Sequence, residues 1–179
     1  MKNIFYWSPF TSKVATVYSV INSAEVVNIN SKRNGFKATI VDAVREWDEF
    51  RETINSKNIE LINLNNNSKF SSMKREGFFR SRLAYWYIFF KCFNPLRKLL
   101  KIQKPDYLII HLITPLPLLL FSIFNFETKL ILRISGFPNM TFLRKLIWKI
   151  AVKRIYKISC PTKATYENLL RYKFLREKL

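Results

Sequence analysis

The chain has 179 residues, of which 49% are hydrophobic and only three are glycine. This length and composition fit one domain with a substantial core, and they exclude a disordered or fibrous protein. The net charge of +19 is concentrated after residue 60, where there are 23 Lys and Arg residues and five Asp and Glu residues. So strong a charge favours an anionic partner, such as phospholipid head groups, a phosphorylated substrate or nucleic acid. A basic solvated surface without a partner is the simpler alternative.

The N-terminal part of the chain predicts alternating strands and helices. Residues 3–7 predict the first strand, and Thr11 or Ser12 begins a helix that runs to about residue 32 and is closed by Gly35. The next predicted elements are a strand at 36–41, a helix at 45–56, a strand at 59–64, a long loop at 65–77, a helix at 78–93 and, after a break at Asn94-Pro95, a helix at 96–103.

The C-terminal part continues this alternation. Its predicted elements are a strand at 107–112, a buried helix at 115–124, a strand at 128–134, a basic amphipathic helix at 141–157, a strand at 158–160 and a last helix capped by Thr162 that runs to about residue 172. Regular alternation of strands and helices is typical of a parallel sheet with helices on both faces. The sequence therefore predicts an α/β fold, a single Rossmann-like doubly wound domain with a mainly parallel sheet.

The segment 107–126 allows a second interpretation, as a membrane span. It carries no charge except that of His111 when protonated, and it is about long enough to cross the hydrocarbon layer. However, Pro115 and Pro117 lie at its centre, and its first residues have a strand-like pattern. A strand, a loop and a buried helix are therefore the favoured interpretation.

Two polar side chains lie at or near the carboxyl ends of predicted strands, where ligands bind in open α/β sheets. His111 is the only histidine, and it could contact a sugar hydroxyl or a developing charge, or be a satisfied core residue. Arg133 interrupts a buried run and needs either a carboxylate, such as Asp42 or Asp106, or a bound anion, because an unpaired buried guanidinium is costly.

Two loops at the same edge could also contact a ligand. Ser135-Gly136 allows close approach of the backbone, although a simple turn explains it equally well. The segment 8–13 combines hydroxyl groups with a helix N-terminus, which suits phosphate as well as ordinary capping.

Several catalytic classes are excluded by what the sequence lacks. It has no Ser/His/Asp spacing, no metal-ligand cluster, no Walker-type loop and no G-x-G-x-x-G, so we expect neither a metal nor a bound cofactor. Cys92 and Cys160 lie far apart, which favours reduced cysteines and a cytoplasmic protein, and the N-terminal apolar run is too short for a signal peptide.

Two basic regions predict an anion-binding surface. The segment 69–104 holds ten Lys and Arg residues and one acid, Glu76, interleaved with aromatic residues. This composition suits an interfacial helix at the membrane surface, and it also suits single-stranded nucleic acid. The predicted surface comprises Arg80, Arg82 and Lys91 of the first region with Arg144, Lys145, Lys149 and Lys153 of the helix at 141–157.

A set of short motifs, taken together, resembles a known family. The motifs are residues 8–16 (SPFTSKVAT), 20–24 (VINSA), 46–47 (EW), 81–82 (SR), 105–112 (PDYLIIHL), 132–138 (LRISGFP) and 160–162 (CPT). In this order they resemble the N-terminal, acceptor-side domain of bacterial family-4 glycosyltransferases of the GT-B fold. The resemblance covers nearly the whole chain.

The resemblance implies a retaining enzyme that moves a sugar from a nucleotide-sugar donor to an acceptor, often a lipid-linked or envelope glycan. It implies that His111 faces the transferred sugar and is the catalytic residue. The residues expected to line the cleft are Ser8, Phe10, Thr11, Ser12, Thr114, Arg133, Ser135 and Gly136. It also implies a location on the inner face of the cell membrane, with nucleotide-sugar, glycan acceptor and an anionic membrane surface as partners and no nucleic acid.

The sequence departs from the family pattern in two places. The first loop lacks the family's paired glycines, since no glycine occurs between Trp7 and Asn34. The donor-binding domain, with its two spaced glutamates, is absent from residues 1–179, so we expect half of a GT-B fold that is inactive alone. The competing hypotheses are a basic nucleic-acid-binding α/β protein and a membrane protein that spans at 107–126.

Overall fold

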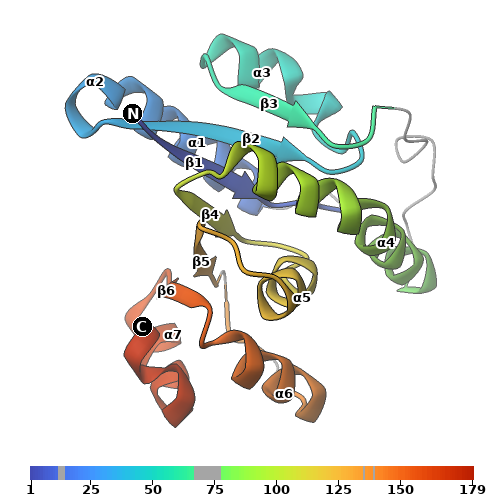
Figure 1. Cartoon of the computed structure of the whole chain (residues 1–179), viewed down its shortest axis with the longest axis vertical. Helices are drawn as coiled ribbons and strands as arrows, with labels where there is room; N and C mark the ends of the chain where they lie inside the picture. Colours follow the sequence, from blue (N-terminus) through green and yellow to red (C-terminus); the bar gives the residue numbers. More distant parts are fainter. Residues whose placement is uncertain (12–14, 67–77, 135, 139) are drawn as a thin grey trace.

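The structure is a computed structural model, and it describes residues 1–11, 15–66, 78–134, 136–138 and 140–179, without the side chains of 78–82 and 143. Its centre is a six-stranded, entirely parallel sheet in the order β3-β2-β1-β4-β5-β6 (Figure 1). The strands are β1 (Lys2–Trp7), β2 (Phe36–Asp42), β3 (Glu60–Asn63), β4 (Tyr107–Ile110), β5 (Lys129–Arg133) and β6 (Ile155–Ser159). The prediction of a Rossmann-like, doubly wound α/β domain is confirmed.

Helices cover both faces of this sheet. They are α1 (Ala15–Ile29), α2 (Ser31–Asn34), α3 (Arg51–Ser56), α4 (Phe78–Gln103), α5 (Pro115–Ile123), α6 (Phe142–Ala151) and α7 (Lys163–Leu170), with 3-10 turns at Asp48–Phe50 and Lys173–Lys178. In Figure 1, α4 crosses in front of the sheet and α1 lies behind it.

Alternation along the strands divides the core between the two faces. On β1, Phe5 and Trp7 pack with α4 and α5, whereas Tyr6 packs on the other face with α1. Successive side chains of a strand point to opposite faces, so a strand covered on both sides is apolar throughout. This burial fixes the register that brings the carboxyl ends of β1, β4 and β5 to one edge.

The helix predicted to break at Asn94-Pro95 is continuous. The 26-residue α4 contains Pro95 in its interior. Proline removes one backbone hydrogen bond and crowds the preceding turn. The helix continues because Cys92, Leu96 and Leu100 are buried on the same side of it, before and after the proline. The predicted break was therefore wrong.

Two other predicted helices are shorter in the structure. The helix predicted at 141–157 ends at Ala151, and the chain then forms β6, which buries Ile155 and Ile158. The helix predicted at 45–56 starts with the 3-10 turn at Asp48, because Arg45 has a positive φ of 69° that interrupts helical geometry. The closure at Gly35 is confirmed, with φ at 70°.

The segment 107–126 divides into β4 and the nine-residue α5. Within the described residues, no helix has both the length and the apolar character needed to cross a membrane.

Candidate functional site

A pocket of about 270 Å³ lies at the carboxyl ends of β4 and β5. We call it the carboxyl-edge pocket. It is lined by His111, Thr114, Leu132, Arg133, Ile134, Gly136, Phe137, Pro138, Arg144 and Trp148. The structure thus brings His111 together with three of the predicted cleft residues, Thr114, Arg133 and Gly136, although they come from two separate parts of the sequence.

The loop after β4 is held in place by β1. The backbone N–H of His111 donates to the carbonyl of Trp7 at 3.0 Å, which extends the strand pairing by one residue. The indole N–H of Trp7 donates to the carbonyl of Ile113 at 3.3 Å. Ile113 has a φ of +46°, which is rare for a β-branched residue and costs on the order of 1–3 kcal/mol. A strained residue between His111 and Thr114 indicates that the geometry of this loop is imposed by its surroundings.

His111 is buried in the wall of the pocket, with 6% of its surface exposed. Its Nε2 atom has no hydrogen-bond partner among the described residues. Burial, and secondarily the charge of Arg133, lower the pKa of His111 to about 4. The imidazole is therefore neutral at neutral pH, and it can offer a hydrogen bond to a ligand without adding charge.

Arg133 ends β5 with its side chain half-buried. The pairing with Asp42 or Asp106 considered above is not found: no ion pair within the described residues joins Arg133 to either, and Asp106 instead accepts the backbone N–H of Asn3 at 2.8 Å. The positive charge of Arg133 lowers the pKa of His111 and partly offsets the burial that raises the pKa of Tyr6. Because the guanidinium is half-exposed and can be solvated by water, a bound anion at Arg133 stays a prediction.

Arg144 was predicted on the outer basic surface, but it also lines the carboxyl-edge pocket. It lies in the first turn of α6, where its backbone N–H donates to the hydroxyl of Thr141, the N-cap residue, at 3.4 Å. No acidic side chain lines the pocket among the described residues. Two permanent cations, a neutral imidazole and an apolar wall that includes Trp148 suit a ligand with both an anionic and a neutral part.

The hydroxyl group of Thr114 does not cap its own helix. Thr114 is the N-cap residue of α5, yet its side chain makes no capping hydrogen bond. The hydroxyl group is therefore available to a ligand that enters the pocket.

The other predicted cleft residues that the structure describes, Ser8, Phe10 and Thr11, do not line this pocket. Ser8 is fully buried, and its hydroxyl has no partner among the described residues. Phe10 belongs to the core, where its ring lies 5.1 Å from that of Trp47 in an edge-to-face arrangement. Thr11 is half-buried in the loop after β1. Ser12 and Ser135 fall outside the described residues.

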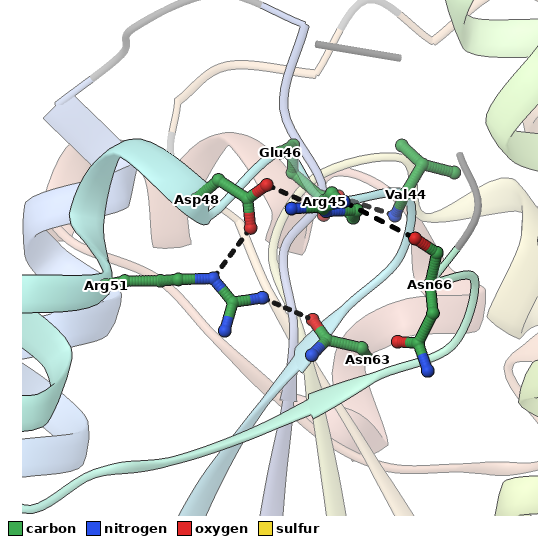
Figure 2. Close-up of polar contacts among 7 residues, drawn as sticks. All are labelled: Val44, Arg45, Glu46, Asp48, Arg51, Asn63 and Asn66. Atoms are coloured by element: carbon green, nitrogen blue, oxygen red, sulfur yellow. Dashed lines mark hydrogen bonds and ion pairs between the residues drawn. The ribbon is translucent and has the colours of Figure 1, made fainter. Parts of the chain in front are cut away.

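A second polar cluster lies at the carboxyl ends of β2 and β3 (Figure 2). The Asp48 carboxylate accepts from the Nε atoms of Arg45 and Arg51 at 2.8 and 2.7 Å. Arg51 also donates to Asn63 at 3.3 Å, and Arg45 reaches the carbonyl of Asn66 at 3.5 Å. In Figure 2 these side chains connect the ends of the two strands to each other.

Asp42 and Glu46 form the buried part of this cluster, and the sequence analysis did not assign them a role together. Glu46 accepts from the backbone N–H groups of Ala43 at 3.1 Å and Val44 at 2.7 Å. Burial, followed by the proximity of the two carboxyl groups, raises the pKa of Glu46 well above its usual range, and burial also raises the pKa of Asp42. The signal in the sequence was an Asp at the end of a strand followed four residues later by a Glu.

The predicted anion surface is partly described. Lys91, Lys145, Lys149 and Lys153 are exposed, with the ammonium groups of the first three about 6 Å from the rings of Tyr87, Tyr172 and Phe174 respectively. The side chains of Arg80 and Arg82 fall outside the description.

No model of a known protein family matches this sequence, and no curated protein is significantly similar to it. Solved structures do match the fold. The UDP-GlcNAc 2-epimerase of Neisseria meningitidis, bound to UDP-GlcNAc, has a TM-score of 0.64 at 14% identity over 99% of this chain and 45% of its own. CalG4, the calicheamicin glycosyltransferase, has a TM-score of 0.50 at 16% identity over 97% and 42%. The spinosyn rhamnosyltransferase SpnG, complexed with thymidine diphosphate, has a TM-score of 0.51 at 10% identity over 90% and 45%.

These comparisons establish the fold. The chain has the architecture of one half of a GT-B protein, and it spans less than half the length of the structures that it matches. Glycosyltransferases and sugar-nucleotide epimerases both occur among these structural neighbours.

Proposed function

We propose that this chain is the acceptor-binding half of a retaining glycosyltransferase that moves a sugar from a nucleotide-sugar donor to a lipid-linked or envelope glycan. The observation that carries the proposal is the carboxyl-edge pocket, where His111, Thr114, Arg133 and Arg144 meet. In open α/β sheets, ligands bind outside the carboxyl ends of the strands, where the strand order reverses. Here the order reverses between β1 and β4, directly beside His111.

Each group in the pocket has a role in this proposal. The neutral imidazole of His111 and the hydroxyl of Thr114 contact hydroxyl groups of the sugar, and the guanidinium groups of Arg133 and Arg144 hold an anionic group of the acceptor. The donor nucleotide binds mainly to a second domain, so we expect residues 1–179 alone to be inactive. The proposed chemistry requires no metal, and no group of three or more potential metal ligands occurs among the described residues.

We also propose that the protein lies on the cytoplasmic face of the cell membrane. On α6, Phe142, Leu146 and Ile150 recur at intervals of four and are 85%, 47% and 55% exposed. Lys145 and Lys149 are exposed on the same helix. An apolar stripe accompanied by lysines supports an interfacial helix.

The acceptor role is tested by NMR titration of the chain with polyprenyl-phosphate-linked sugars and, separately, with UDP, UDP-GlcNAc and TDP. We expect the acceptor to perturb His111, and Arg133→Gln to weaken its binding about tenfold, as expected for loss of one charge-assisted contact. Arg33→Gln, a matched change on the exposed helix α2, should have no effect. Tight nucleotide binding without acceptor binding would contradict the assignment.

The membrane role is tested by sedimentation with anionic liposomes. Binding should fall as salt rises, because the interaction is partly electrostatic. Salt-insensitive behaviour or no sedimentation would count against it. Strong binding of single-stranded nucleic acid that is lost in Trp86→Ala would favour the nucleic-acid alternative instead.

A further inference from the structure

A second pocket lies at the opposite edge of the sheet, at the amino ends of β5 and β6. It has a volume of about 330 Å³, and we call it the amino-edge pocket. It is lined by Phe121, Phe124, Phe126, Glu127, Thr128, Lys129, Lys153, Arg154, Ile155, Tyr156 and Lys178. None of these residues lines the carboxyl-edge pocket, so the two pockets are separate sites.

The charge of the amino-edge pocket is strongly unbalanced. Lys129, Lys153, Arg154 and Lys178 all contribute to its wall. The single acid in the wall, Glu127, is bound by Lys104 from outside the pocket at 2.5 Å. No ion pair among the described residues neutralises any of the four cations. Like charges gathered around one cavity repel each other, and a bound anion relieves this repulsion.

Part of this wall is held in place before any ligand arrives. The ammonium group of Lys129 lies 5.0 Å from the centre of the Tyr156 ring and 5.7 Å from that of Tyr107. Two contacts of this kind restrict the long side chain of Lys129, so less conformational entropy is lost when it binds an anion. The backbone N–H of Arg154 donates to the carbonyl of Ala151 at 2.9 Å, which fixes the turn that presents its guanidinium group.

The pocket also has uncharged features that bear on the ligand. Thr128 is 5% exposed, and its hydroxyl has no hydrogen-bond partner among the described residues. Phe124, Phe126 and Tyr156 provide aromatic surface on the same wall. The pocket therefore suits a ligand that has a multiply charged group with several acceptor oxygens, attached to a less polar part.

We propose that the amino-edge pocket binds a phosphate group, carried either by a soluble phosphorylated molecule or by an anionic lipid head group. Phosphate offers several charged oxygens, which can accept from Lys129, Lys153 and Arg154 at once, and an arginine binds it with two parallel hydrogen bonds. The proposal does not depend on the proposed glycosyltransferase function, because it uses a different edge of the sheet.

The test measures binding of inorganic phosphate and pyrophosphate by calorimetry, and of phosphatidylcholine vesicles with and without phosphatidylglycerol by sedimentation. The variant is Lys129→Gln/Arg154→Gln, which changes two exposed side chains and should leave the thermal unfolding midpoint nearly unchanged. The matched control is Lys32→Gln/Arg33→Gln, which removes the same charge from the remote helix α2. Arg133→Gln serves as a probe of the carboxyl-edge pocket.

We expect the Lys129/Arg154 variant to bind its phosphate ligand at least about tenfold more weakly, and the Lys32/Arg33 control to bind it normally. Loss of phosphate and pyrophosphate binding alone identifies a soluble ligand. Loss of the phosphatidylglycerol-dependent vesicle binding identifies a head group. Equal losses in the Lys32/Arg33 control would show a diffuse charge effect and overturn the proposal. Loss confined to Arg133→Gln, or no binding of any of these probes, would overturn it as well.

Discussion

The two halves of the sheet's carboxyl edge differ in how their ionisable side chains are bound. At the end of β2, the carboxyl group of Glu46 is buried and accepts from the backbone of its own loop, beside Asp42. At the end of β5, the guanidinium of Arg133 is half-exposed, faces a pocket, and forms no ion pair within the described residues. Ionisable groups whose hydrogen bonds are made inside the fold hold a loop together. A charged group without such bonds, at the edge of a cavity, is the better candidate for binding a ligand.

The largest expected effect is on the β2 side. Glu46→Ala removes the acceptor of two buried backbone N–H groups and leaves a cavity, so we expect a loss of about 3 kcal/mol in the free energy of unfolding, measured by urea denaturation. Glu46→Gln keeps one carbonyl acceptor and should cost less. Glu52→Ala, a change on the exposed side of α3, should stay within about 0.5 kcal/mol. Equal losses for Glu46→Ala and Glu52→Ala would show that the cluster does not hold the loop.

The same acid pair predicts a pH dependence of stability. Folding raises the pKa of both Asp42 and Glu46, so over the pH range between the unfolded and folded pKa values the folded state binds more protons than the unfolded state. The pair therefore stabilises the protein fully below the unfolded pKa, and this contribution is lost as pH rises through the folded pKa. The slope is up to about 1.4 kcal/mol per pH unit for each group.

The measurement is the difference in unfolding free energy between the wild type and Asp42→Asn at a series of pH values. Taking a difference cancels the contributions of the other titrating groups. The stability of the wild type relative to the variant should fall as pH rises above about 4, where the unfolded carboxyl groups begin to ionise. A relative stability that rises with pH would mean that the pair is charged and well solvated in the fold.

At the other end of the carboxyl edge, the contribution of His111 to stability should depend on pH with the opposite sign. Its pKa is lowered to about 4, so between this value and its usual pKa the unfolded state binds more protons, and this contribution to stability is lost as pH falls. His111 is the only histidine, so its NMR titration can be assigned without ambiguity. Arg133→Gln should raise the pKa of His111 by only a fraction of a unit, because burial is the larger cause. Titration near 6.5 in the wild type would show that the imidazole is open to water.

Sequence reasoning predicted the basic side of this edge better than the acidic side. The pattern of apolar runs that end in His111 and Arg133 located the two strand ends, and parallel pairing then brought them together with Thr114 and Gly136. Arg144 was predicted only on an outer surface. No local pattern in the sequence shows that the first turn of α6 lies next to the end of β5. Sequence reasoning missed the joint role of Asp42 and Glu46 for a related reason: the buried turn between them depends on the positive φ of Arg45. Pro95 also misled it, because burial on both sides of the proline outweighs the local cost of the residue in α4.

The smallest expected effect on stability is the most direct test of the contrast between Glu46 and Arg133. Arg133→Gln removes a half-exposed guanidinium that has no ion pair within the described residues, so the free energy of unfolding should change by less than about 0.5 kcal/mol. Removing one of two cations that line the same pocket also reduces their mutual repulsion. Urea denaturation in the absence of ligand gives this value, and the acceptor titration of the same variant gives the loss of binding. A stability loss as large as that of Glu46→Ala would mean that Arg133 is a structural residue, and the two ends of the edge would then not differ in kind.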